Sequence, residues 1–84
     1  MTVVEIYSKE ECHLCERAKD KLKEIRVRHP FELREILLRE GHPRFDEFNE
    51  LVPVIVINDR VAFHYRVPEK EFIELLRNGS EPAK

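Results

Sequence analysis

The amino-acid sequence predicts an α/β fold, in which a four-stranded mixed sheet is flanked by helices. Three observations carry this prediction. Apolar residues alternate with polar ones in some segments and recur at helical spacing in others, so strands and helices follow one another along the chain. The aliphatic run at residues 53–57 is typical of a strand that is buried on both faces. The Asn58-Asp59 pair after this run is typical of a hairpin turn.

The first strand is expected at residues 2–7, where β-branched and aromatic side chains place Val4 and Ile6 on the same face. Residues 8–11 are polar and end this strand. A helix is expected over residues 13–26, because apolar side chains recur there at i, i+3, i+7 and i+10, the spacing of one helix face. These side chains are Cys15, Ala18, Leu22 and Ile25.

A second strand and a short helix are expected in the middle of the chain. The His29-Pro30 pair ends the first helix, because the residue before a proline is disfavoured in the α region. Residues 31–36 alternate apolar and polar side chains, which indicates a strand. After a turn, a short helix is expected from Arg44 to Leu51. The apolar side chains on its inner side would be Phe45, Phe48 and Leu51.

The last two strands are expected to form a hairpin. Residues 53–57 would be the central strand, and Val61, Phe63 and Tyr65 alternate along the segment that returns from the turn. The connection rules make the first two strands parallel, joined through the first helix, and make the last two antiparallel. The predicted order is therefore strand, helix, strand, helix, strand, strand, helix.

The last helix is expected to begin at Pro68, because the first turn of a helix tolerates a missing N–H, and to end at Gly79. Its apolar face would consist of Phe72, Ile73, Leu75 and Leu76. A chain of 84 residues makes one domain. We expect this domain to span residues 1–79 and residues 80–84 to form a flexible tail.

Charge and hydropathy narrow the classes of protein. The net charge is −2, from 15 basic and 17 acidic side chains, and no like-charge block or basic stripe is present. Binding to nucleic acid or to an anionic membrane is therefore not expected. No apolar run approaches the roughly 18 residues that span a bilayer, and the N-terminus lacks the pattern of a signal peptide. We expect a cytoplasmic monomer.

Cys12 and Cys15 are the only cysteines, and they lie at the start of the helix that follows the first strand. Cys12 would lie at the helix terminus, where unpaired N–H groups and the helix dipole favour a thiolate. Cys15 falls on the apolar stripe and would be shielded. Disulfide exchange requires this pairing, because one thiol attacks to form a mixed disulfide and its neighbour then releases the product. The sequence thus predicts a dithiol thiol–disulfide oxidoreductase.

Two other functions stay open beside this one. A C-x-x-C pair can be half of a zinc site, but such a site normally needs two further ligands. There is no second cysteine pair, and His29, His42 and His64 are isolated from one another, so no metal site is predicted within the chain. A metal or iron–sulfur carrier that uses Cys12, and a non-catalytic binding module, are the alternatives.

Residues near the cysteines would adjust their chemistry. Lys9 and a protonated His13 would stabilise a Cys12 thiolate, whereas the neighbouring glutamates would oppose them. Pro53 is expected close to the cysteines, where a cis bond would leave the backbone groups of Val52 facing them, ready to pair with an extended substrate. A trans Pro53 would merely begin a strand.

Together these motifs resemble the glutaredoxin-like branch of the thioredoxin superfamily over nearly the whole chain. The similar motifs are Tyr7-Ser8-Lys9 before Cys12-x-x-Cys15, then Val52-Pro53-Val54, then the Asn58-Asp59 hairpin. The resemblance implies a thioredoxin fold, with Cys12 as the nucleophile and Cys15 as the resolving thiol. It also implies that Pro53 is a cis-proline and that Lys9 stabilises the thiolate and binds a substrate carboxylate. His13, Leu14 and Val52 would be further substrate-binding residues.

The chain departs from the family pattern at three places. His13-Leu14 stands where glutaredoxins usually have Pro-Tyr, and Leu51 stands in place of Thr. Arg66-Val67-Pro68-Glu69 replaces the Gly-Gly and acidic residue that hold glutathione's γ-glutamyl carboxylate. The resemblance implies protein or small-molecule disulfides as substrates, a thiol or reductase as electron donor, and no tightly bound cofactor. The missing glycines predict that glutathione is a poor co-substrate.

Overall fold

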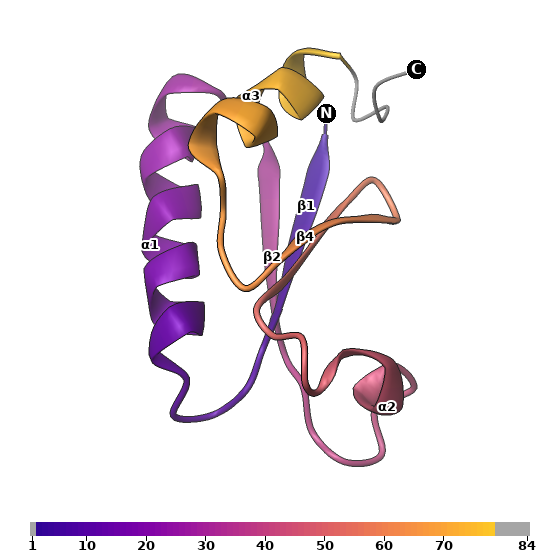
Figure 1. Cartoon of the computed structure of the whole chain (residues 1–84). Coiled ribbons are helices and arrows are strands. Elements are labelled where there is room, and N and C mark those ends of the chain that lie inside the picture. The colour runs from indigo at the N-terminus through magenta and orange to yellow at the C-terminus, as the bar shows by residue number, and fades with distance from the viewer. Residues whose placement is uncertain (1, 79–84) are drawn as a thin grey trace.

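The computed structural model describes residues 2–78 and has the predicted α/β architecture (Figure 1). Its sheet has four strands in the order β2-β1-β3-β4. Strands β1 and β2 are parallel, whereas β3 is antiparallel to both β1 and β4. The elements are β1 (Val3–Ser8), α1 (His13–Arg28), β2 (Glu32–Leu37), α2 (Phe45–Phe48), β3 (Val54–Ile57), β4 (Arg60–His64) and α3 (Glu69–Arg77).

The predicted order of elements and the pairing of the strands are confirmed. Helix α3 ends at Arg77, and Asn78 caps it. The expected stop at Gly79, the tail at residues 80–84 and the domain boundary between them lie outside the described residues. None of the helices formed by residues 2–78 combines the length and apolar character needed to cross a bilayer.

Two clusters of buried side chains cover the two faces of the sheet, because successive residues of a strand point to opposite faces. The first cluster joins the sheet to α1 and α3, and the second joins it to α2, as the positions of the helices in Figure 1 show. In β3, Ile55 and Ile57 belong to the first cluster, and Val54 and Val56 belong to the second. The expectation that this strand is central and buried on both faces is confirmed.

Helix α1 buries the four side chains that its periodicity predicts, namely Cys15, Ala18, Leu22 and Ile25. It continues two residues beyond the expected end at Arg26 and stops at Arg28. The N–H of His29 still donates to the carbonyl of Ile25 at 2.9 Å. The helix thus runs as far as the residue before Pro30 allows, because only that residue is forced out of the α region.

Helix α2 is a single turn, so the expected helix from Arg44 to Leu51 was too long. The chain must become extended by Val52, which precedes Pro53, and residues 49–51 therefore form a turn. The N–H of Leu51 donates to the carbonyl of Phe48 at 2.8 Å in this turn. The three apolar side chains expected on the inner side, those of Phe45, Phe48 and Leu51, do pack into the second cluster.

Tyr65 does not lie on β4 as expected, because the strand contains a bulge. Ile55 pairs with Phe63 and Val56 pairs with Val61, so Ala62 is an extra residue and the alternation of side chains breaks there. The strand therefore ends at His64, and Tyr65 follows it with a φ of 75°. The predicted hairpin turn is confirmed, since Asn58 and Asp59 have φ values of 46° and 68°.

Candidate functional site

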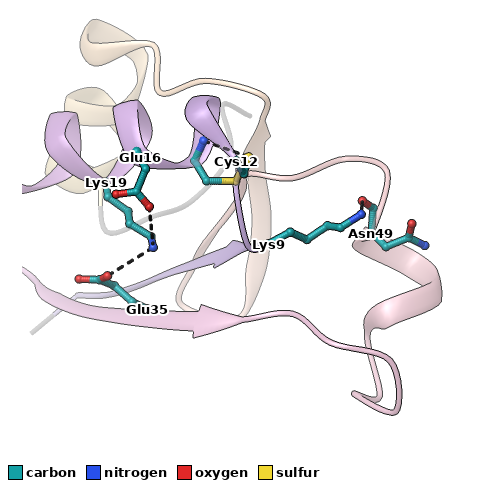
Figure 2. Close-up of a disulfide and its surroundings, with 7 residues drawn as sticks. Lys9, Cys12, Glu16, Lys19, Glu35 and Asn49 are labelled. Carbon is teal, nitrogen blue, oxygen red and sulfur yellow. Dashed lines mark hydrogen bonds and ion pairs between the residues drawn. A yellow bond between two sulfur atoms is a disulfide. The ribbon is translucent and has the colours of Figure 1, made fainter.

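The two cysteines form a disulfide at the N-terminus of α1 (Figure 2). Cys12 is the N-cap of the helix, and Glu11, with a φ of 54°, turns the chain into it. The Cys12 Sγ accepts a hydrogen bond from the N–H of Cys15 at 3.2 Å. Cys12 is half-buried, whereas Cys15 is 0% exposed. The expected placement of a reachable thiol before a shielded one is confirmed.

This geometry has a direct chemical consequence for the reduced pair. A thiolate on Cys12 would accept the same backbone N–H and would lie at the positive end of the helix dipole. Both effects stabilise the charged form, so they lower the pKa of a thiol below its ordinary value. Because Cys15 is fully buried and Cys12 is only half-buried, a second disulfide would approach Cys12.

Lys9 reaches away from the cysteines. Its Nζ donates to the backbone carbonyl of Asn49 at 3.3 Å, and Figure 2 shows the side chain extending from the end of β1 towards α2. In this arrangement Lys9 connects the loop before Cys12 to the helix on the other side of the sheet. Its expected role in stabilising the thiolate and binding a substrate carboxylate stays a prediction.

Val52 and Pro53 directly precede β3, at the end of the sheet where β1 leads to the cysteine loop. Val54 pairs with Tyr7, so the two residues before Val54 run past the segment that leaves β1 for Cys12. The Val52–Pro53 bond is cis, as the resemblance implied. Within residues 2–78, no backbone hydrogen bond is made by Val52. Its expected role in pairing with an extended substrate stays a prediction.

His13 and Leu14, the two residues between the cysteines, are both exposed in the first turn of α1. Leu14 is one of the most exposed large apolar side chains of the described chain. Both positions agree with contact to a substrate that approaches Cys12, and both roles stay predictions.

We expect His13 to adjust the reduction potential by its charge. A protonated imidazole next to Cys12 favours the reduced thiolate and makes the disulfide more oxidising, but the effect of an exposed charge corresponds to about 20 mV at most. His13→Ala should therefore lower the potential slightly at pH 6 and hardly at all at pH 8. Equilibration of the wild type and the variant with a thiol redox buffer at both pH values measures the reduction potential. An equal change at both would indicate an effect of shape.

The N-terminus of α3 differs from an open anion site. Pro68 is its N-cap and brings no N–H, and Glu69 is the first helical residue. The Glu69 carboxylate accepts a hydrogen bond from the Nζ of Lys21 at 3.2 Å, and this contact raises the pKa of Lys21 above its ordinary value. The carboxylate at the start of α3 is thus already ion-paired within the protein.

Metal binding would require more ligands than residues 2–78 bring together. Among residues 2–78, no three His, Cys, Asp or Glu side chains lie together so that they could hold a metal ion. A metal bound by Cys12 and Cys15 would thus need ligands from other molecules or from outside this part of the chain.

Tyr65 is the residue near the site that sequence reasoning missed. Its N–H donates to the carbonyl of Pro53 at 2.8 Å, and its side chain lines the same surface groove as Leu14. The sequence does not signal the bulge in β4. Without this bulge, the regular alternation would have continued the strand through Tyr65.

The fold and the dithiol at the helix N-terminus define a glutaredoxin-like protein with a thioredoxin-like fold. Residues 3–77 match the glutaredoxin-like domain (DUF836), and the chain therefore belongs to this family. It is also similar to protein Ne2328 from Nitrosomonas europaea, solved in solution by NMR. The two share 27% sequence identity over 87% of each chain, with a TM-score of 0.75. No curated protein matches the sequence.

Proposed function

We propose that this protein is a dithiol thiol–disulfide oxidoreductase that reduces protein or small-molecule disulfides in the cytoplasm. One observation carries the proposal: Cys12, a half-buried residue, caps a helix with its sulfur and is disulfide-bonded to the fully buried Cys15. Membership in a glutaredoxin-like family supports it. A reducing compartment suits it, because C-x-x-C pairs there are more often catalytic than structural.

The reaction begins with the reduced pair. The Cys12 thiolate attacks one sulfur of the substrate disulfide, so that one substrate thiol leaves and takes up a proton. The Cys15 thiol then loses its proton and attacks the Cys12 sulfur, which breaks the mixed disulfide and releases the second substrate thiol. The substrate has gained two electrons and two protons, and the Cys12–Cys15 disulfide is formed. A thiol or reductase donor then reduces the pair again.

Substrate backbone would bind at Val52. Its N–H and carbonyl have no backbone partner within the described residues and lie beside the loop that carries Cys12. An extended segment can pair with such groups as an added strand does, which holds its disulfide near Cys12. His13 and Leu14 would contact the same segment from the first turn of α1.

The start of α3 favours a reductase of the thioredoxin-reductase type over glutathione as the electron donor. Pro68 removes one N–H from the start of α3, and the Gly-Gly pair that holds glutathione in the family pattern is absent there. Lys21 neutralises part of the charge of Glu69, the first residue of this helix. Glutathione recognition is therefore weakened rather than abolished.

A steady-state assay with hydroxyethyl disulfide and with an unfolded disulfide-bonded protein tests this function. We expect turnover with a thioredoxin-reductase-type donor to exceed turnover with glutathione and glutathione reductase. Cys12→Ser should reduce the rate to the uncatalysed level with either donor, because it removes the attacking sulfur. The matched variant Cys15→Ser should accumulate a mixed disulfide with the protein substrate.

Three outcomes would contradict the proposal in different ways. Binding of disulfide proteins without turnover would indicate a binding module, and a coloured cluster after gentle purification would indicate an iron–sulfur carrier. Turnover with glutathione that equals that of an authentic glutaredoxin would leave the oxidoreductase intact but contradict the expected donor.

A further inference from the structure

A surface groove of about 320 Å³ runs along the first turns of α1, and Leu14, the residue before Cys15, lines it. It separates the first turns of α1 from the segment that joins β4 to α3. Leu14 and Tyr65 form its apolar part, and they are 50% and 47% exposed. We call this surface the Leu14–Tyr65 groove. Two large apolar side chains that remain this exposed beside a reactive disulfide are suited to contact a ligand.

The backbone holds Tyr65 in the groove in an unfavourable conformation. Its φ of 75° lies in the left-handed region, which is rare for a bulky side chain. The N–H of Tyr65 donates to the carbonyl of Pro53 at 2.8 Å, and its ring lies edge-on to that of His64 at a centroid distance of 5.3 Å. Backbone strain of this kind is concentrated at sites of binding and catalysis.

Three cationic side chains line the groove, and two of them have no partner within residues 2–78. Arg17 and Arg66 line it, and neither guanidinium has an ion-pair or hydrogen-bond partner within residues 2–78. Lys21 also lines it but is already paired with Glu24 and Glu69. A free guanidinium binds a carboxylate through two parallel hydrogen bonds, which makes these arginines candidates for an acidic partner.

We infer that the Leu14–Tyr65 groove docks an extended segment of a substrate protein that carries an apolar residue and an acidic residue close to its reactive cysteine. This inference rests on the proposed oxidoreductase function and names its substrate class. Arg17 lies five positions after Cys12, which corresponds to about 7.5 Å along the helix axis. An extended chain rises about 3.3 Å per residue, so the acidic side chain belongs two or three residues from the substrate cysteine.

A polypeptide fits this groove better than glutathione does. Glutathione has carboxylates but no apolar side chain that could cover Leu14 and Tyr65. Its γ-glutamyl end would also meet the Glu69 carboxylate at the start of α3. A protein segment supplies both the apolar contact and the acidic group, and it can pair with the open backbone of Val52 at the same time.

The test uses three capped peptides as symmetrical disulfides, with the sequences Cys-Leu-Glu-Glu, Cys-Leu-Gln-Gln and Cys-Leu-Lys-Lys. The reduced full-length chain reacts with each, and the rate is divided by its rate with the small, uncharged hydroxyethyl disulfide. At low salt the acidic peptide should react about tenfold faster than the basic one. At 0.5 M NaCl this ratio should fall to about 2 or less, because exposed charges are screened.

Variants test which residues cause the preference for the acidic peptide. Arg17→Glu combined with Arg66→Glu should invert the preference, and Arg17→Gln alone should reduce it. The control Arg26→Glu reverses one charge, half the change made by the double variant, at an exposed site about 13.5 Å further along α1 than Arg17, and it should keep the wild-type ratio. Tyr65→Gly suits the left-handed backbone but removes the ring, so all three peptides should slow relative to hydroxyethyl disulfide. Tyr65→Phe should retain the wild-type rates.

Equal normalised rates for the acidic and basic peptides would overturn the inference. If hydroxyethyl disulfide were still reduced in that case, the oxidoreductase would stand and only the docking groove would fall. No reduction of any disulfide would overturn both. Glutathione disulfide that reacts faster than the acidic peptide, with the same dependence on Arg17 and Arg66, would reassign the groove to glutathione and also overturn the inference.

Discussion

In the reduced protein, iodoacetamide is expected to alkylate Cys12 about a hundredfold faster than Cys15 at pH 7. The difference in thiolate fraction contributes little. A lowered pKa raises that fraction, but the intrinsic nucleophilicity of the thiolate falls at the same time. Burial is the larger effect. Cys15 is 0% exposed, so iodoacetamide can reach it only after the first turn of α1 has opened. An opening free energy of about 3 kcal/mol accounts for the hundredfold difference.

Peptide mass spectrometry after short pulses of iodoacetamide measures both rates. Because burial causes the selectivity, it should vanish in 6 M guanidinium chloride, where both thiols react alike. The Cys15→Ser variant allows Cys12 to be titrated alone, and its labelling midpoint should lie below pH 8.5, since a backbone N–H and the helix dipole favour the thiolate. Equal labelling of both thiols in the native protein would contradict the assignment of Cys12 as the attacking residue.

Local periodicity is the reason why much of the fold was predictable from the sequence. The buried face of α1 follows from spacing alone, and Cys15 belongs to that face together with Leu22 and Ile25. Cys12 precedes this face by three residues, and the polar loop before it marks the helix start. The contrast between a reachable and a shielded cysteine could therefore be predicted before any three-dimensional information.

Features that depend on packing between distant segments were not predictable. The bulge in β4 follows from how that strand registers on β3, and no residue type near Ala62 signals it. Its consequence is that Tyr65 leaves the strand and lines the groove beside Leu14. Lys9 illustrates the same limit, since its partner Asn49 lies 40 residues further along the chain. A long, flexible side chain takes its partner from whatever the fold brings near it.

Phe72→Ala is expected to destabilise the protein by about 3–5 kcal/mol. Phe72 is 0% exposed and packs α3 against one face of the sheet near both of its edge strands, because its ring lies 5.5 Å from that of Phe31, just before β2, and 6.5 Å from that of Phe63 in β4, between centroids. Truncation would leave a cavity and remove two aromatic contacts. A domain of 84 residues has a total stability of about 4–12 kcal/mol, so the loss is a large part of it.

Thermal and urea unfolding measure this loss, and the midpoint temperature should fall by about 15–30 °C. The matched control is Val27→Ala on α1, which removes an 83% exposed apolar side chain and should change stability by no more than about 0.5 kcal/mol. Because Tyr65 and Arg66 lie just before α3, the Phe72 variant should also lose its preference for acidic peptides at temperatures where it is still largely folded. A stability within 1 kcal/mol of wild type would mean that α3 does not depend on this contact to pack on the sheet.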